Sequence, residues 1–203
     1  MYNQISPFIF DCTTCPTQCD GLSKNNYQFE NDVNYSEQYE QKIIDHINSL
    51  EGYVAFKTTE PGFPDIQIIN QKEQTISYLE VKAQQRTFMA VGKVLPFSGL
   101  TPSETIALNL SDLVRYIDLQ DKLGLKISIL WVLSNRACMV KPNETLYFFQ
   151  KLDMLKNIYN TEKDKRRFKR ASGEGDVVDG LHKGVTLNYH FSLRELDRWA
   201  SPL

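Results

Sequence analysis

Long apolar runs, histidine and net charge are all scarce in this chain of 203 residues. No apolar stretch approaches the roughly 20 residues that a membrane helix requires. The first residues, MYNQISPFIFDC, lack the basic start and the long apolar run of a secretory signal. We therefore expect a cytoplasmic protein with no membrane partner.

Three histidines and the absence of a glycine-rich phosphate loop argue against two common classes of site. A histidine-ligated hydrolase centre has little support, and nothing resembles the loop that cradles nucleotide phosphates. The formal net charge of -2 gives the molecule no overall field that would attract nucleic acid. A nucleic-acid partner would therefore have to bind a local basic patch.

One segment, EKDKRRFKR at residues 162–170, concentrates six cations against two acids. A basic stripe of this kind can hold phosphates even when the whole molecule is acidic. Most charge runs are solvated loops, however, and the sequence favours neither interpretation. Phe168, among the cations, could stack on an unpaired base. The candidate DNA-binding residues are Lys165, Arg166, Arg167, Lys169 and Arg170.

The four cysteines are unevenly spaced, because three of them fall within eight residues. They are Cys12, Cys15, Cys19 and Cys138. Without an export signal, such a group is typical of a metal site and not of a disulfide framework. Four thiolates suit zinc or an iron–sulfur cluster, and the two cannot be separated here. Free thiols are the alternative, and less favoured fourth ligands are Asp20, His182 and His190.

Residues 1–34 are polar and irregular apart from the cysteine group. The first predicted element is a helix from Ser36 to about Leu50, which Gly52 ends. The next predicted elements are strands at 53–58, 65–70 and 75–82, a helix starting at Thr101, a helical segment from Ser111 to Gly124, and a strand at 126–133. Beyond them we expect a strand at 146–150, a helix, a strand at 185–191 and a short helix at 192–199. The order α-β-β-β-α-β predicts an α/β fold with a mixed sheet and helices on its faces.

Two carboxylates frame the hairpin formed by the second and third predicted strands. Asp65 starts one strand and Glu80 lies near the end of the other, so pairing would bring both to the same end of the hairpin. Strand alternation places Glu80 and Lys82 on one face and Val81 on the other. Two hard oxygen ligands beside a cation are what metal-dependent phosphodiester hydrolysis requires. The lysine could orient or deprotonate water, or stabilise charge on phosphorus.

Pro64-Asp65, fourteen further residues and then Glu80-Val81-Lys82 resembles the signature of the PD-(D/E)XK nuclease superfamily. Restriction endonucleases, archaeal Holliday-junction resolvases and RecB-like nucleases belong to it. The resemblance covers roughly residues 36–150 and implies a restriction endonuclease-like αβββαβ core there, with helices on both faces. Residues 1–35 would then be an N-terminal segment that contains three of the cysteines, and residues 151–203 a C-terminal extension that contains the basic segment. It also implies that Asp65, Glu80 and the Val81 carbonyl hold Mg²⁺ or Mn²⁺ while Lys82 acts on the water. Further site residues that it implies are Glu40 on the first helix, with Glu37 as second choice, and Gln84.

The leading hypothesis is thus a metal-dependent DNA endonuclease. The alternative is a non-catalytic nucleic-acid-binding or assembly protein, built on a nuclease-like scaffold that a cysteine metal site staples. Fold alone does not separate the two. A homodimer would suit cleavage of both strands at a symmetric site.

Overall fold

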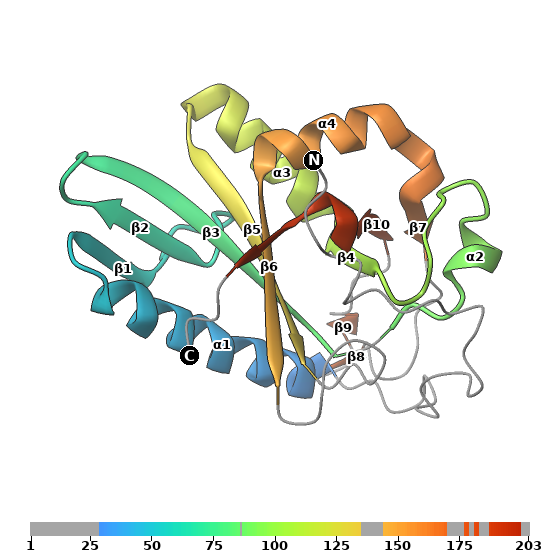
Figure 1. The fold of residues 1–203 in the computed structure, drawn as a ribbon, viewed down its shortest axis with the longest axis horizontal. Helices are drawn as coiled ribbons and strands as arrows, with labels where there is room; N and C mark the ends of the chain where they lie inside the picture. Colours follow the sequence, from blue (N-terminus) through green and yellow to red (C-terminus); the bar gives the residue numbers. More distant parts are fainter. Residues whose placement is uncertain are drawn as a thin grey trace.

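A six-stranded mixed sheet organises the chain (Figure 1). The computed structural model describes residues 29–85, 87–134, 144–169, 177–178, 181–182 and 187–199. In spatial order the strands are β1 (Tyr53–Lys57), β2 (Ile66–Asn70), β3 (Thr75–Gln84), β5 (Lys126–Ser134), β6 (Thr145–Lys151) and β11 (Asp197–Trp199). Neighbours are antiparallel except β3 and β5, which run parallel. The predicted mixed α/β sheet is confirmed.

Helix α1 (Phe29–Ser49) lies against one face of the sheet (Figure 1). Its buried residues Ile43, Ile44 and Ile47 follow helical spacing and pack on Leu79 and Val81 of β3. The helix begins seven residues before the predicted Ser36, because a serine favours a helix start without requiring one. It ends one residue before the predicted position.

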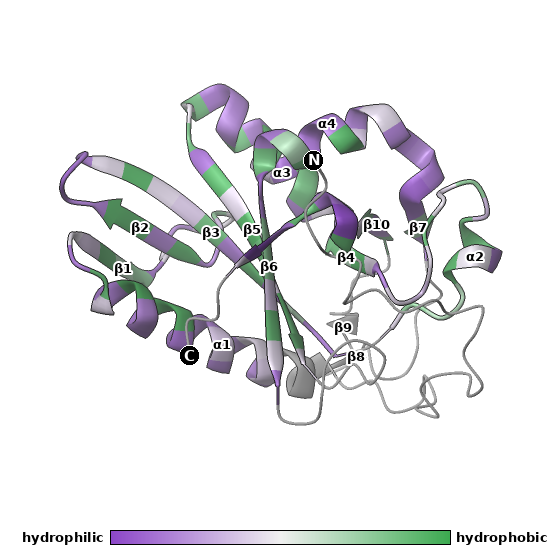
Figure 2. Ribbon diagram, in the orientation of Figure 1, coloured by the Kyte–Doolittle hydropathy of each residue, from purple (hydrophilic) through white to green (hydrophobic). Residues whose placement is uncertain are grey.

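The opposite face carries α3 (Leu110–Leu123), α4 (Leu152–Glu162) and a second sheet. That sheet has the order β4 (Thr105–Asn109), β10 (Leu187–Ser192) and β7 (Arg167–Lys169). Hydrophilic residues interrupt the hydrophobic ones along α3 and α4, as expected of helices with one buried side (Figure 2). Because both faces of the sheet are covered, Ile129 to Leu133 of β5 are fully buried, as the almost wholly apolar sequence KISILWVL at residues 126–133 predicts.

The predicted helix start at Thr101 is wrong. Residues 102–104 form a turn, and the strand β4 follows at once. Both the backbone N–H and the hydroxyl of Thr101 donate to Glu104 Oε1, at 3.0 and 2.7 Å. These capping contacts form without a helix, because the next residues pair with β10 along their whole length.

The C-terminal elements also differ from the prediction. The capping box at Ser192 and Glu195 is present, but it starts only a 3₁₀ turn, Leu193–Glu195. The chain then becomes β11 and pairs with β6, and Trp199 meets Tyr147 edge-on with ring centroids 6.3 Å apart. Tertiary pairing therefore overrides the local helix signal at residues 196–199.

Three short elements complete the description: α2 (Val91–Val94), the 3₁₀ turn η4 (Lys163–Arg166) and a hairpin of β8 (Val177–Val178) with β9 (Leu181–His182). None of the helices that the structure describes combines the length and apolar character needed to cross a bilayer.

Candidate active site

The β2–β3 hairpin brings Asp65 to the middle of β3. Ile66 pairs with Leu79, so Asp65 stands just before the point where the two strands begin to pair. Its Oδ2 accepts a hydrogen bond from the backbone N–H of Val81 at 2.8 Å. Asp65 therefore lies beside the Glu80-Val81 peptide, as the hairpin prediction requires.

Glu80 and Lys82 lie on the opposite face of β3 from Val81. Glu80 is 2% exposed, and its Oε1 forms an ion pair with Lys82 Nζ. Its Oε2 accepts a hydrogen bond from the hydroxyl of Tyr116 at 2.5 Å. Lys82 Nζ also lies 3.6 Å from Asp112 Oδ2. The cluster thus contains Asp65 and Glu80 from the hairpin, and Lys82, whose ammonium lies between Glu80 and Asp112. Helix α3 contacts both Glu80 and Lys82.

Helix α3 supplies Asp112 and Tyr116, two residues that the sequence analysis missed. Asp112 accepts hydrogen bonds from Asn109 Nδ2 at 2.9 Å and Arg115 Nη2 at 2.6 Å. Arg115 Nε donates to the carbonyl of Gly62 at 2.8 Å, which ties α3 to the loop before Asp65. Asp112 and Tyr116 are four residues apart, and residues i and i+4 share a face of a helix. This spacing is the signal in the sequence that could have identified them.

The helical spacing of the apolar residues Leu110, Leu113, Val114 and Ile117 predicts a buried face that is slightly rotated from the observed one. Val114 is 42% exposed, whereas Tyr116 is 2% exposed. Tyr116 is amphipathic, and its ring fills the core while its hydroxyl reaches Glu80. A tyrosine four residues after an aspartate is therefore the residue that faces the site.

Burial and like charge set the protonation of the cluster. Burial, followed by the charge of Glu80, raises the pKa of Asp65 to about 7, against the opposing effects of Lys82 and the Val81 N–H. Burial lowers the pKa of Lys82, but the charges of Glu80, Asp65 and Asp112 outweigh it and raise the pKa overall. Burial and the charge of Glu80 raise the pKa of Tyr116. Lys82 and Tyr116 therefore stay protonated at neutral pH.

Glu40 reaches the same region from α1, on the other side of the sheet. It is 7% exposed, and its Oε2 lies 3.0 Å from Nζ of Lys57 at the end of β1. Its charge contributes to the raised pKa of Asp65. Glu37 contacts the same lysine at 3.6 Å, but 55% of its side chain is exposed. Of the two glutamates, Glu40 is the one buried beside the hairpin.

Gln84 is placed differently from the other site candidates. Its Nε2 donates to the carbonyl of Ala107 at 2.8 Å, and its Oε1 accepts from the N–H of Ala107 at 3.3 Å. Trp131 Nε1 donates to the same carbonyl at 3.0 Å. These contacts use both ends of the Gln84 amide to dock the end of β3 on β4.

The oxygen donors fit a magnesium-type ion better than a zinc-type ion. Within the described ranges, no three Asp, Glu, His or Cys side chains gather closely enough to hold a metal by themselves. Mg²⁺ commonly takes only one or two carboxylates and completes its shell with water and substrate phosphate. Asp65 and Glu80 are such a pair, and an added positive charge would oppose the burial and the neighbouring charge that raise the pKa of Asp65.

The basic segment is divided between the surface and the interior. Arg166 is 8% exposed, and its Nη1 lies 2.7 Å from Glu195 Oε2, which leaves it little surface for a phosphate. Lys165 Nζ lies 3.6 Å from Glu162 Oε2. Arg167 and Lys169 are exposed on β7. Arg170 and the four cysteines, Cys12, Cys15, Cys19 and Cys138, lie outside the described residues.

The two histidines that are alternative fourth ligands of the cysteine site, His182 and His190, lie within the described residues. His190 is buried, its Nδ1 lies 3.1 Å from the carbonyl oxygen of Arg166, and burial lowers its pKa to about 4. Its ring stacks on Phe88, which also packs against Phe168. His182 belongs to β9. The ring of Phe168 is therefore already packed against aromatic neighbours.

Comparison with known proteins gives little. No protein-family model matches the chain, and no curated protein matches it. Among solved structures, it is similar to Hjc, a Holliday junction resolvase from Archaeoglobus fulgidus, with a TM-score of 0.41 and 11% identity. The match covers 78% of this chain and 84% of Hjc. So distant a likeness decides nothing about activity, which has to be inferred from the site itself.

Replacing Asp65 by Asn tests the buried charge pair. A raised pKa means that the folded protein holds the Asp65 proton more tightly than the unfolded chain does. The ionised carboxylate therefore costs stability, and this cost grows as pH rises from about 4 to about 7. In metal-free buffer at pH 8, the free energy of unfolding of Asp65→Asn should exceed that of the wild type by on the order of 2 kcal/mol, as measured by thermal unfolding. The gain should be smaller at pH 5.

Mg²⁺ should reverse that order. It should raise the unfolding midpoint of the wild type at pH 8 and leave Asp65→Asn nearly unchanged, because the variant lacks the charge. Asp118→Asn, on the exposed side of α3, is the matched control. Equal midpoints for wild type and Asp65→Asn at every pH would contradict the conclusion that Asp65 is a buried carboxyl group with a raised pKa.

Tyr116→Phe tests the support of Glu80. The change removes the hydroxyl that donates to Oε2 and leaves a buried carboxylate oxygen without its donor. Urea unfolding should show a loss of about 1–3 kcal/mol. Tyr53→Phe, at a position that is 40% exposed, should change stability little. Equal losses in the two variants would mean that the contact with Glu80 contributes nothing.

Proposed function

We propose that the protein is a divalent-metal-dependent nuclease that hydrolyses DNA phosphodiester bonds as an endonuclease. The observation that supports it is the meeting of Asp65 with the Glu80-Val81 peptide while Lys82 is held against Glu80. The residues come from two paired strands and so keep their relative positions. Two acids and an ammonium group in one partly buried cluster match the needs of phosphodiester hydrolysis.

Asp65, Glu80 and the Val81 carbonyl would hold Mg²⁺ or Mn²⁺, and Glu40 would add negative charge from α1. When bound, the ion would polarise the phosphodiester and make a nucleophile available at neutral pH. Lys82 pairs with Glu80 and lies 3.6 Å from Asp112 Oδ2, so its ammonium would stay beside the site if Glu80 held the ion.

Lys82 acts in this scheme as a cation and not as a base. The three surrounding acids raise its pKa, so it stays protonated and can donate a hydrogen bond to a phosphate oxygen or orient the attacking water. Asp112 keeps it on the correct side of β3, and Tyr116 fixes the carboxylate of Glu80. A homodimer would bring two such sites to opposite strands of a duplex.

One observation favours the non-catalytic alternative. Glu80 is already satisfied by Lys82 and Tyr116, as it would be in a purely structural buried ion pair. A nuclease-like scaffold could retain this cluster for stability alone. The distinction therefore requires an activity measurement.

Plasmid cleavage in Mg²⁺ or Mn²⁺ separates the two functions. We expect the wild type to nick or linearise supercoiled DNA, and Asp65→Ala and Lys82→Ala each to lose roughly 100-fold or more of the rate. Exposed Asp118 and Lys72 provide matched controls, and their alanine variants should cut normally. EDTA should stop cleavage.

Two outcomes would count against the proposal in different ways. Normal cutting by Asp65→Ala would place the active site elsewhere. DNA binding without any cutting by the wild type would support the non-catalytic alternative.

The cysteine site stays a separate proposal with its own test. Cys12, Cys15, Cys19 and Cys138 would together bind zinc or an iron–sulfur cluster. Metal analysis of anaerobically purified protein should find about one zinc or about four iron per chain. Cys138→Ser should reduce that content, whereas wild type free of both metals would end this idea.

A further inference from the structure

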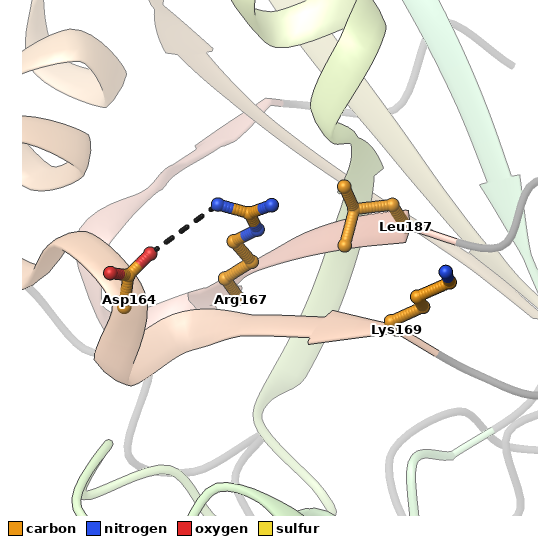
Figure 3. A pocket seen from close by; sticks show the side chains of 4 residues that line it. All are labelled: Asp164, Arg167, Lys169 and Leu187. Atoms are coloured by element: carbon orange, nitrogen blue, oxygen red, sulfur yellow. Dashed lines mark ion pairs between the residues drawn. The ribbon is translucent and has the colours of Figure 1, made fainter.

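Strand β7 sorts the basic segment into residues that point inward and residues that point outward. Phe168 is half-buried and packs against Phe88, with ring centroids 5.4 Å apart. Alternation along the strand turns its neighbours Arg167 and Lys169 to the other side. Figure 3 shows both cations on the same side of their strand, together with Leu187 from β10.

These outward residues line a hollow of about 580 Å³ with Asp164 and Leu187 (Figure 3). Arg167 Nη1 lies 3.6 Å from Asp164 Oδ1, and the aspartate side chain is 90% exposed. A pair that long and that open to solvent holds its arginine weakly. Lys169 has no ion-pair partner within the described part of the chain. Both cations are therefore available to an anion.

The hollow is joined to the candidate active site by the second sheet. Asn109 pairs with Asn188, and Asn188 pairs with Phe168, so one row crosses β4, β10 and β7. Two strand spacings make that row about 10 Å long. At its near end, Asn109 contacts Asp112 at 2.9 Å, and Asp112 lies 3.6 Å from Lys82.

Together these steps limit the distance from Lys82 Nζ to the backbone of Phe168 to about 20 Å, little more than half a turn of B-DNA. The backbone of β7 therefore lies close enough to Lys82 for one duplex to span the distance. Directly paired residues share a face of the sheet, so Arg167 and Lys169 point away from the face on which Asn109 meets Asp112.

We propose that Arg167 and Lys169 form a binding site for the phosphodiester backbone of DNA, away from the bond that is cut. The inference rests on the proposed nuclease function, because it assigns a second contact to the same substrate. Arginine can grip a phosphate with two parallel hydrogen bonds, and lysine adds a point charge. Leu187 gives the sugar an apolar surface. Such contacts position a duplex without reading its sequence.

The test is the salt dependence of binding to a short fluorescein-labelled DNA duplex, in EDTA so that nothing is cut. Arg167→Gln/Lys169→Gln in the full chain should lower the slope of log K against log salt by roughly 0.9 for each lost contact, about 1.8 in all. The control is Lys122→Gln/Lys126→Gln, which removes the same charge from exposed positions at the far end of α3 and the start of β5. It should keep most of the slope.

Asp164→Asn supplies a prediction of opposite sign. It removes a negative charge from the hollow and frees Arg167, so the duplex should bind several-fold more tightly. This variant alters only an exposed side chain, so its result does not depend on tolerance of a double change.

Equal loss of slope in the two double variants, or an unchanged slope in Arg167→Gln/Lys169→Gln, would overturn the phosphate site. Plasmid cleavage by the wild type would leave the nuclease proposal standing in that case. Conversely, the expected slopes together with no cleavage would keep the DNA site and reject the nuclease. A protein that neither binds nor cuts DNA would overturn both proposals.

Discussion

The contact on which the site depends is the hydrogen bond from the Val81 N–H to Asp65. It holds a carboxylate against the strand that carries Glu80, so two acids share a partly buried space. Burial and, after it, the charge of Glu80 raise the pKa of Asp65 to about 7, so the ionised pair is unfavourable alone. The surrounding groups offset this cost: an ammonium from Lys82, a hydroxyl from Tyr116 and a peptide N–H. A divalent cation would offset it more completely, and the same strain that weakens the metal-free protein would then favour binding.

Helix α3 connects this local chemistry to the fold. Strands β3 and β5 are parallel, so the chain must cross over between them, and α3 is part of that crossover. The crossover lays the helix over the face of β3 that bears Glu80 and Lys82. Asp112 and Tyr116 then reach both residues, and Arg115 fastens the helix to the loop before Asp65. A change that moved α3 would therefore disturb both acids and the lysine together.

Sequence reasoning worked where periodicity decides structure. The period of two along β3 correctly separated Glu80 and Lys82 from Val81, and the hairpin correctly placed Asp65 beside them. It failed where a local signal has two structural outcomes. The residues from Thr101 to Glu104 form capping hydrogen bonds, yet a strand follows because β10 offers a pairing edge. Asp112 and Tyr116 were missed because a search for apolar spacing ignores polar groups that a helix turns inward. The sequence of the basic segment does not show which of its side chains point outward. Their alternation becomes clear only once residues 167–169 are known to form the strand β7.

The second sheet connects residues far along the chain to the candidate site. Strand β10 pairs with β4 on one side and with β7 on the other, and β4 leads directly into α3. Arg166 anchors this arrangement by its ion pair with Glu195, so the buried arginine and the exposed cations beside it have different tasks. The backbone that carries Arg167 and Lys169 is thereby fixed relative to the backbone that carries Asp112. A duplex held on β7 would therefore lie at a defined distance from Lys82. That fixed distance would let contacts to the DNA backbone, which carry no sequence information, determine which phosphodiester bond meets Asp65 and Glu80.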